Sequence, residues 1–321
     1  MKTACYTAYG GTETIIVADV PIPRPAAGEV LIRVHAAPVT AGDARMRSGR
    51  VPRGFGLLLR LVIGWRRPRV ALGWAFSGEV AGLGAGVTTF TVGQRVFGLK
   101  GFRGGTHAEY LTIRADGPVL PLPATLDHKA GAAFFFGGLT ALQFLTVKAG
   151  LQPGERVLII GATGAVGSAA VQIAAQLGAR VTAVASTANH ALARKLGAEA
   201  VHDYRVGPVS GTFDVILDVM GTCGWTGAKA LLAPGGRLCL ITADLAGTLG
   251  AALRPRRQGR RIIAGTSGEG RADMERLVQV HSQGGYTPVL GQVLPFEQLQ
   301  QAHRIAESFH KPGNLVVVMR P

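Results

Sequence analysis

The stretch Arg156–Gly178, RVLIIGATGAVGSAAVQIAAQLG, decides the fold. It opens with Val157–Ile160, a short apolar run of the kind that forms a buried parallel strand. A glycine-rich turn follows, and apolar residues then recur at helical spacing from Val166 to Leu177, after which Gly178 can end the helix. Strand, glycine turn and helix in this order predict a nucleotide-binding βα unit.

The turn carries the glycines that a dinucleotide needs, with one exception. Gly164 would let the backbone approach a pyrophosphate, Gly167 would let helix and strand pack closely, and the helix N-terminus offers free N–H groups. Ala162 stands where the usual G-x-G-x-x-G pattern has its first glycine. A glycine turn that binds nothing is the alternative. We expect cofactor contacts from Ala162, Thr163, Gly164, Ala165, Val166 and Gly167.

Length and composition favour a globular α/β enzyme. The 321 residues are enough for one large or two medium domains, and the chain is 47% apolar with 46 glycines. No apolar run is long enough to span a bilayer; the most apolar segment, Phe55–Trp65, is short and contains Arg60. Met1–Cys5 lacks the apolar core of a signal peptide, so we expect a cytoplasmic protein without a membrane partner. Three distant cysteines form no disulfide framework.

The net charge of +15 raises the possibility of a nucleic-acid partner. Neither aromatic interleaving nor zinc-finger spacing accompanies the basic residues, so we favour a solvated surface that also steers an anionic cofactor. The main basic clusters are Arg60, Arg66, Arg67 and Arg69, and Arg254, Arg256, Arg257, Arg260 and Arg261.

The rest of the chain divides by pattern. Residues 1–123 predict an all-β module, with strands near 14–17, 30–34, 78–82, 93–98 and 108–113. The less regular span at 45–68 predicts a loop with helical turns. Residues 127–149 are helical in character. Alternating strands and helices follow up to residue 281, which predicts a doubly wound parallel sheet. The tail predicts a strand at 289–294, a helix at 296–309 and a strand at 315–319.

Short signatures along the whole chain resemble one family. They are Gly28–Val34, Gly78–Gly84, Gly93–Val96, His107–Tyr110, Gly138–Ala141, Gly154–Val157 and Leu196–Ala198. In this order and at these intervals the sequence resembles the zinc-independent quinone oxidoreductase branch of the medium-chain dehydrogenase/reductase superfamily. The resemblance implies a mostly β, GroES-like catalytic domain (residues 1–125 and 284–321) around a Rossmann domain (126–283). It also implies an active site in the cleft between them and a homodimer.

The zinc ligands of the alcohol dehydrogenases in this superfamily are missing. Thr40 stands in the slot of the first cysteine, and Trp74 and Ala75 follow Gly73 where His-Glu would be. No cysteine lies between Cys5 and Cys223, which leaves no four-cysteine structural zinc lobe. The eight histidines are scattered, and we expect surface or core roles for them. No metal site is therefore predicted.

The segment after the second strand of the βα series points to NADPH. NAD-specific Rossmann sites place an Asp or Glu there, whereas residues 185–189 read Ala-Ser-Thr-Ala-Asn. Hydroxyl and amide groups can accommodate a 2′-phosphate, and Arg194, Lys195 or Arg205 could reach it. Helix capping by Ser186 and Thr187 is compatible with either cofactor. The segment and the resemblance together imply ribose-side contacts from Ser186, Thr187, Asn189 and Tyr204. The resemblance implies further contacts from Thr140, Val219, Thr242 and Asn314.

Fewer residues qualify for catalysis. Thr40 and Asp43 follow the strand that leads into the cleft, and Trp74 could form a wall of the substrate pocket. Asp43 could equally cap a helix that begins at Ala44. Many relatives carry Asn in the slot of Thr40, and the tyrosine that some enoyl reductases use as proton donor falls near Val51 and is absent.

These observations predict an NADPH-dependent reductase of quinones or α,β-unsaturated carbonyl compounds. One alternative is a zinc-free alcohol or aldehyde oxidoreductase. Another is an NADPH-binding protein without turnover, a redox sensor or an RNA-binding protein, for which the basic surface is the support.

Overall fold

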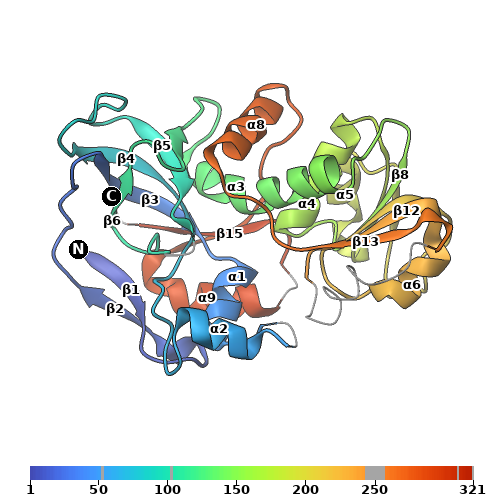
Figure 1. Cartoon of the computed structure of the whole chain (residues 1–321), viewed down its shortest axis with the longest axis horizontal. Coiled ribbons are helices and arrows are strands. Elements are labelled where there is room, and N and C mark those ends of the chain that lie inside the picture. The colour runs from blue at the N-terminus through green and yellow to red at the C-terminus, as the bar shows by residue number, and fades with distance from the viewer. Residues whose placement is uncertain (52–53, 102–103, 243–256, 309–310, 320–321) are drawn as a thin grey trace.

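The structure is a computed structural model, and it describes residues 1–51, 54–101, 104–242, 257–308 and 311–319. Figure 1 shows a β-rich half that holds both ends of the chain and an α/β half beside it. Arg254 and Arg256, which the sequence places in the second basic cluster, lie outside the described residues.

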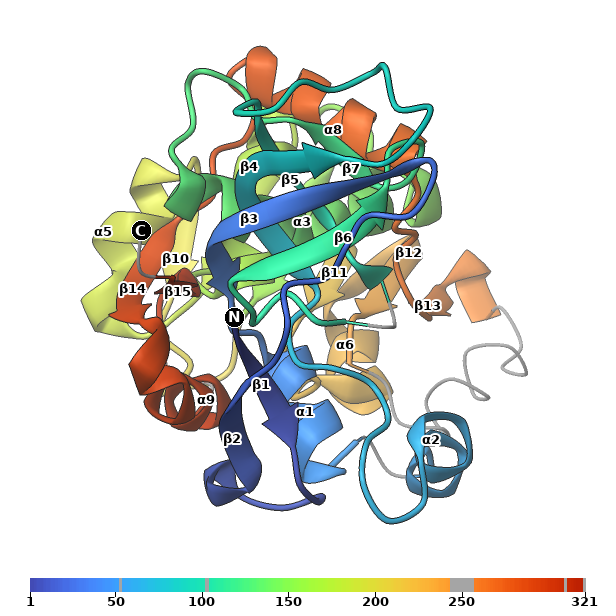
Figure 2. The same ribbon diagram turned by 90° about the vertical axis from the view of Figure 1, so that its left-hand side faces the viewer.

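A seven-stranded sheet forms the β-rich half, and Figure 2 faces it. Its order is β14-β15-β3-β4-β5-β7, with β6 also paired to β3. Along β3, buried and more exposed residues alternate, because Val30, Ile32 and Val34 face the core. The bounds are β3 Glu29–Pro38, β4 Ala75–Leu83, β5 Arg95–Leu99, β6 Tyr110–Arg114, β7 Val119–Pro121, β14 Leu290–Pro295 and β15 Asn314–Val318.

A separate antiparallel pair, β1 (Lys2–Tyr6) and β2 (Ile15–Asp19), completes the β elements of this half. The predicted strands of the N-terminal module are all present within a few residues, and β1 and β7 are additional. The span that looked irregular contains two helices, α1 (Ala41–Ser48) and α2 (Gly56–Ile63). Helix α1 contains the start at Ala44 that the sequence offered as an alternative, but it begins three residues earlier.

The α/β half confirms the predicted doubly wound sheet, with six parallel strands in the order β10-β9-β8-β11-β12-β13. Alternate residues of β8 enter different cores: Val157 and Ile159 join the core that contains α4, and Leu158 joins the core that contains Ala228 of α6. Both faces of the sheet are therefore covered. The strands are β8 Arg156–Ile160, β9 Arg180–Val184, β10 Ala200–His202, β11 Phe213–Asp218, β12 Leu232–Leu240 and β13 Arg261–Ala264; the helices are α4 Ala165–Gln176, α5 His190–Lys195, α6 Gly224–Leu231 and α8 Arg271–Ser282.

Strand β12 begins at Leu232 and runs through the Pro-Gly-Gly sequence at 234–236. The glycines at 235 and 236 suggest a turn before the strand, yet Leu232 already pairs with Phe213 and a register shift lies between the Phe213 and Val215 pairs. The Pro-Gly-Gly sequence is thus accommodated as an irregularity within the strand.

Helix α3 (His128–Leu142) joins the halves and continues as a π-helix over Gln143–Lys148. Its 21 residues are long and apolar enough to cross a membrane, but 78% of the apolar window is buried inside the protein. Phe134 and Phe135 are fully buried in the core that α3 shares with α4. The apolarity of α3 is therefore that of a core helix.

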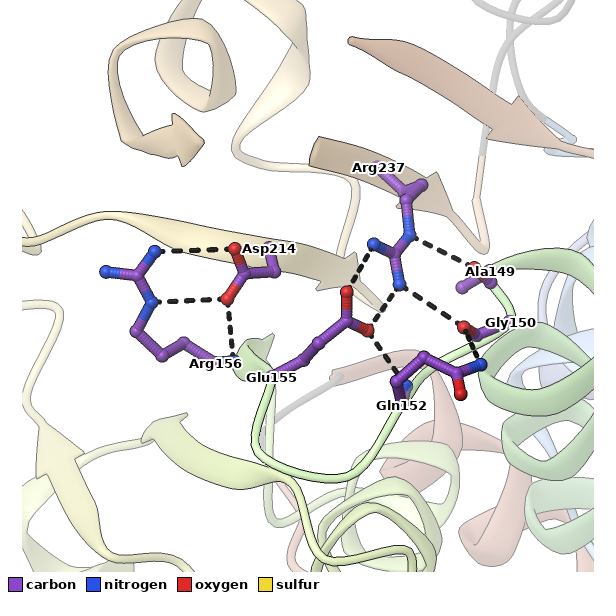
Figure 3. A network of polar contacts seen from close by, with 7 residues as sticks. All are labelled: Ala149, Gly150, Gln152, Glu155, Arg156, Asp214 and Arg237. Carbon is purple, nitrogen blue, oxygen red and sulfur yellow. Dashed lines mark hydrogen bonds and ion pairs between the residues drawn. The ribbon is translucent and has the colours of Figure 1, made fainter. Parts of the chain in front are cut away.

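An ion-pair network holds the end of the parallel sheet opposite the glycine turn (Figure 3). Arg237 of β12 donates to both carboxylate oxygens of Glu155, over 2.6 and 2.7 Å, and its Nε donates to the carbonyl of Ala149. Beside it, Arg156 pairs with Asp214 of β11 at 3.2 Å. The network thus ties the starts of β8 and β11 to the middle of β12.

The tail returns to the β-rich half. Strand β15 pairs antiparallel with β3, where Val317 lies opposite Ala37, and β14 adds outside β15. Helix α9 (Leu299–Ser308) packs beneath them through Leu299, Ala302 and Ala306. The prediction that the last strand leaves the nucleotide-binding sheet is confirmed.

Candidate active site

The glycine turn between β8 and α4 has the geometry of an anion cradle. Gly161 adopts a φ of +80°, and a Cβ on Gly167 would lie 2.0 Å from the carbonyl oxygen of Gly161. A Cβ on Gly164 would meet only that same oxygen, at 3.7 Å, so its outer side is open. The first helical bond runs from the Ser168 amide to the Gly164 carbonyl, which leaves the N–H groups of the first turn, from Ala165 to Gly167, to a ligand.

A cavity of about 360 Å³ lies beside this turn on the β9 side. Three of the predicted ribose-side residues line it: Ser186, Asn189 and Tyr204. Asn189 donates from Nδ2 to Ser186 Oγ over 3.1 Å, so the two side chains lie together at the end of β9. Thr163 and Gly164 supply its turn side.

Thr187 and Arg205 donate hydrogen bonds to Asp203. The amide and hydroxyl of Thr187 both donate to Asp203 Oδ2, and Arg205 binds the same carboxylate from Nε and Nη2 at 3.0 and 2.7 Å. The Arg205 guanidinium, followed by Thr187, holds the pKa of Asp203 well below its usual range. Arg205 is therefore already paired, and Thr187 lies outside the residues that line the cavity.

A second cavity, of about 390 Å³, lies in the cleft between the two halves. Gly161 and Gly164 line both cavities, so the glycine turn stands between them. The predicted residues that line this second cavity are Thr40, Gly164, Ala165, Val166, Val219, Thr242 and Asn314. They come from both halves of the chain.

Thr40 and Asp43 form a capping box at the start of α1. The amide of Thr40 donates to Asp43 Oδ2 over 2.8 Å, the hydroxyl donates to the same oxygen over 2.6 Å, and the Asp43 amide donates back to Thr40 Oγ1. Asp43 Oδ1 also accepts the amide of Gly73 at 3.2 Å. The helix therefore begins at Ala41 and not at Ala44, with Thr40 as its N-cap and the fully buried Asp43 as the third residue that completes the capping box. Thr40 stands at the cleft with its proton directed to Asp43.

The remaining predicted residues lie away from the described cavity walls. Thr140 donates to the carbonyl of Phe136 in its own helix at 2.8 Å and lies 3.4 Å from Ser267 Oγ. Trp74 borders β4, where its carbonyl accepts the amide of Lys100. Ala162 is fully buried, and Gly167 contacts the turn. These four residues do not line either cavity.

Two cations in the site were not found from the sequence. Lys311 lines both cavities and donates to the carbonyl of Gly313 at 3.2 Å. Burial lowers the pKa of its ammonium to about 8. Arg45 of α1 lines the cleft as well, and burial lowers the pKa of its guanidinium. Lys311 is brought to the turn by the long-range pairing of β15, which no local pattern reveals.

The cleft-lining residues that the structure describes include no Cys, His, Asp or Glu, so they offer no set of zinc ligands. Elsewhere, the structure brings together three residues that the sequence left scattered. Ligand atoms of His35, Glu79 and His128 lie within 4.8 Å of one another. The two imidazoles are stacked with an interplanar angle of 12°, and Arg33 already bonds Glu79 at 2.9 Å. Stacked rings cannot both direct a lone pair at one ion without rotating.

A nicotinamide dinucleotide fits the residues of the groove. The open face of Gly164, the first turn of α4 and the half-buried ammonium of Lys311 suit a diphosphate. The cavities on either side of the turn can take the two halves of the molecule.

Comparisons with known proteins agree with a catalytic domain beside a cofactor-binding domain. Residues 26–124 match the alcohol dehydrogenase GroES-like domain, and residues 196–317 match the zinc-binding dehydrogenase family. Quinone oxidoreductase of Rattus norvegicus is 30% identical over 97% of this chain and 95% of its own length.

Two solved structures show the same fold. The quinone oxidoreductase from Coxiella burnetii has a TM-score of 0.86 and 27% identity, over 100% of this chain and 99% of its own. The quinone oxidoreductase from Thermus thermophilus, whose structure is described with its NADPH complex, has a TM-score of 0.79 and 28% identity, over 99% of this chain and 100% of its own. Fold, groove and relatives together make this chain an NAD(P)H-dependent oxidoreductase of the medium-chain dehydrogenase/reductase superfamily.

Proposed function

We propose that the chain is a zinc-independent, NADPH-dependent reductase of quinones or α,β-unsaturated carbonyl compounds. The observation that carries the proposal is the chemistry of the cleft wall. The described residues of this wall include two cations, Arg45 and Lys311, as well as apolar side chains and a few hydroxyl and amide groups. Reduction of a simple ketone concentrates charge on one oxygen, which zinc stabilises in metal-containing relatives. A conjugated acceptor spreads that charge and needs less stabilisation.

When bound, NADPH supplies the hydride. The amides at the start of α4 and the Lys311 ammonium would hold its diphosphate. Ser186, Asn189 and Tyr204 would surround the ribose phosphate without a carboxylate to repel it. Val219, Thr242 and Asn314 line the cleft side of the turn and would orient the nicotinamide.

The acceptor would occupy the cleft beside Thr40. The apolar walls, to which Val39, Phe136 and Ile241 belong, exclude water from the reacting atoms. Arg45 would supply positive charge where the acceptor oxygen gains electron density, because Lys311 is taken up by the diphosphate. Because the Thr40 proton is directed to Asp43, we expect the final proton to come from solvent.

Support for the domain division comes from the strand pairing. We propose that residues 1–125 and 284–321 form the catalytic domain and that 126–283 form the cofactor domain. We propose a homodimer on the basis of the resemblance to the quinone oxidoreductases, and sedimentation of the purified chain tests this assembly. The cytoplasmic location stays a prediction from the sequence.

Steady-state oxidation of NADPH with a panel of small ortho- and para-quinones tests the function. Turnover that depends on the enzyme and saturates with quinone supports the proposal. Binding of NADPH without turnover on any quinone or enone would favour the non-catalytic alternative.

A further inference from the structure

The exposed lobe around α2 carries a row of large apolar side chains on the protein surface. We call Phe55–Arg69 the basic apolar lobe; it contains α2 and the turn after it. Leu57 and Leu61 lie one turn apart on α2, and Trp65 follows in the turn after the helix, which ends at Ile63. The exposed fraction is 63% for Leu57, 68% for Leu61, 61% for Val62 and 58% for Trp65.

The opposite side of the lobe is anchored to the protein. Ile63 is fully buried, and the carbonyl of Gly64 accepts the hydroxyl of Tyr9 at 2.7 Å. The Arg60 guanidinium lies over the ring of Tyr9, 5.5 Å from its centre. The lobe is therefore fixed to the protein on one side, and its apolar row remains exposed to solvent on the other.

Positive charge surrounds this row. Residues 44–78 contain eight arginines and no Asp or Glu. Four of these arginines belong to the lobe and are exposed: Arg60, Arg66, Arg67 and Arg69. The lobe thus combines apolar side chains with charge of one sign, the pairing that interfacial membrane helices use.

We propose that the basic apolar lobe docks onto the surface of an anionic lipid bilayer. The apolar row would insert at the boundary between headgroups and acyl chains, and the arginines would bind lipid phosphates. An eight-residue helix is too short to span a bilayer, so the docking is peripheral. A second copy of this chain is a poor occupant, because two arginine-rich lobes would repel each other. The proposal departs from the absence of a membrane partner expected from the sequence.

Docking would set the orientation of the enzyme. In Figures 1 and 2, α2 and α1 lie at the same end of the molecule, opposite α8. Helix α1 carries Arg45, which lines the cleft. Docking through α2 would therefore place the end of the molecule that carries α1 near the bilayer. The proposal does not depend on the proposed acceptor.

Flotation with lipid vesicles tests the docking. Wild-type protein is mixed with vesicles of phosphatidylcholine alone or of phosphatidylcholine with about one third phosphatidylglycerol, at low and high salt. We expect binding to the anionic vesicles only, weakened at high salt. The double variant Leu61→Gln/Trp65→Ser should reduce the partition coefficient by at least roughly tenfold, and Arg66→Gln/Arg67→Gln by roughly 30-fold.

Matched controls separate the lobe from the general surface. Val92→Gln/Val147→Gln removes two valines that are 63% and 62% exposed elsewhere, and Arg24→Gln/Arg276→Gln removes two distant exposed positive charges. Neither control should lose binding, and Leu61→Gln/Trp65→Ser should keep its turnover of a water-soluble quinone. Absence of wild-type binding, equal loss in the controls, or a dimer that only the lobe variants dissociate would overturn the proposal.

Discussion

The amide of Gly313 donates a hydrogen bond to the carbonyl oxygen of Thr163 over 2.7 Å, and Gly164 and Gly313 form a parallel β-bridge. The residue before the last strand of the β-rich half is thereby fixed to the glycine turn of the α/β half. This contact sets the cleft geometry, because Lys311 and Asn314 flank Gly313 and both line the cavity.

Replacing Gly313 by Ala should disturb this contact. Gly313 has a φ of +61°, and a Cβ there would lie 2.5 Å from the carbonyl oxygen of Val289. We expect Gly313→Ala to lower the free energy of unfolding by about 1–3 kcal/mol and to weaken NADPH binding about tenfold. Chemical denaturation and fluorescence titration measure the two effects. In the control Gly284→Ala, the glycine has a φ of +76° and nothing lies near the added Cβ, so NADPH binding should not change. Equal loss of NADPH binding in the two variants would contradict the role of the Gly313 contact.

Lys311 should make NADPH binding pH-dependent. Its pKa of about 8 means that the ammonium is charged below pH 8 and neutral well above it. The wild-type affinity should therefore fall as the pH rises through this region. Lys311→Gln should weaken binding roughly 10–100-fold at pH 7 and flatten the profile, while Lys311→Arg should keep its affinity to higher pH. Calorimetric titrations check this, with the exposed Lys229→Gln as control; a wild-type profile that is flat between about pH 7 and 9.5 would refute the assignment.

Ser186 should determine the cofactor preference. A carboxylate at this position would repel a 2′-phosphate and could bind a free 2′-hydroxyl. We expect wild-type protein to prefer NADPH and Ser186→Asp to shift the preference toward NADH. Dissociation constants of both cofactors measure the effect, and equal constants in the wild type would count against NADPH.

The Glu155–Arg237 pair should stabilise the sheet without contributing to the site. The Arg237 bonds lower the pKa of Glu155, so the stabilisation is present above its ordinary value near 4.5 and is lost as the pH falls. At pH 7, Glu155→Gln should cost about 1–2 kcal/mol of unfolding free energy. Glu199→Gln breaks an exposed pair with Arg180 and should cost less than about 0.5 kcal/mol. Equal costs, or a changed NADPH affinity in Glu155→Gln, would disagree with this assignment.

His128 should make the protein sensitive to mild acid. Burial, followed by the charges of His35 and Arg95, lowers its pKa to about 4, against the opposing effect of Glu79 and Asp127. Because the folded pKa lies below the unfolded value of 6.5, the stabilisation is complete above pH 6.5 and declines as the pH falls toward 4. Melting temperatures across this range should decline less in His128→Asn, which can retain the bond to Ser77. Identical declines would show that other groups govern the acid response.

Local sequence patterns predicted the strands and helices whose formation depends on neighbouring residues. The strand before Gly161 and the helix after Gly164 follow from apolar spacing and glycine geometry, and the break in alternation after residue 281 revealed the return of the tail. The pairing of Arg205 with Asp203 and the placement of Lys311 depend on contacts between distant segments or on side-chain rotamers. The exposure of Leu57, Leu61 and Val62 on α2 likewise depends on tertiary packing, which their apolar composition does not reveal.

The central claim is hydride transfer to conjugated acceptors without a catalytic metal. Its most direct test compares NADPH oxidation with 2-cyclohexen-1-one and with cyclohexanone, two acceptors of matched size, before and after dialysis against a chelator. The account predicts faster turnover of the enone and an unchanged rate after chelation. Faster turnover of the saturated ketone, or activity that is lost with the chelator and restored by zinc, would contradict it.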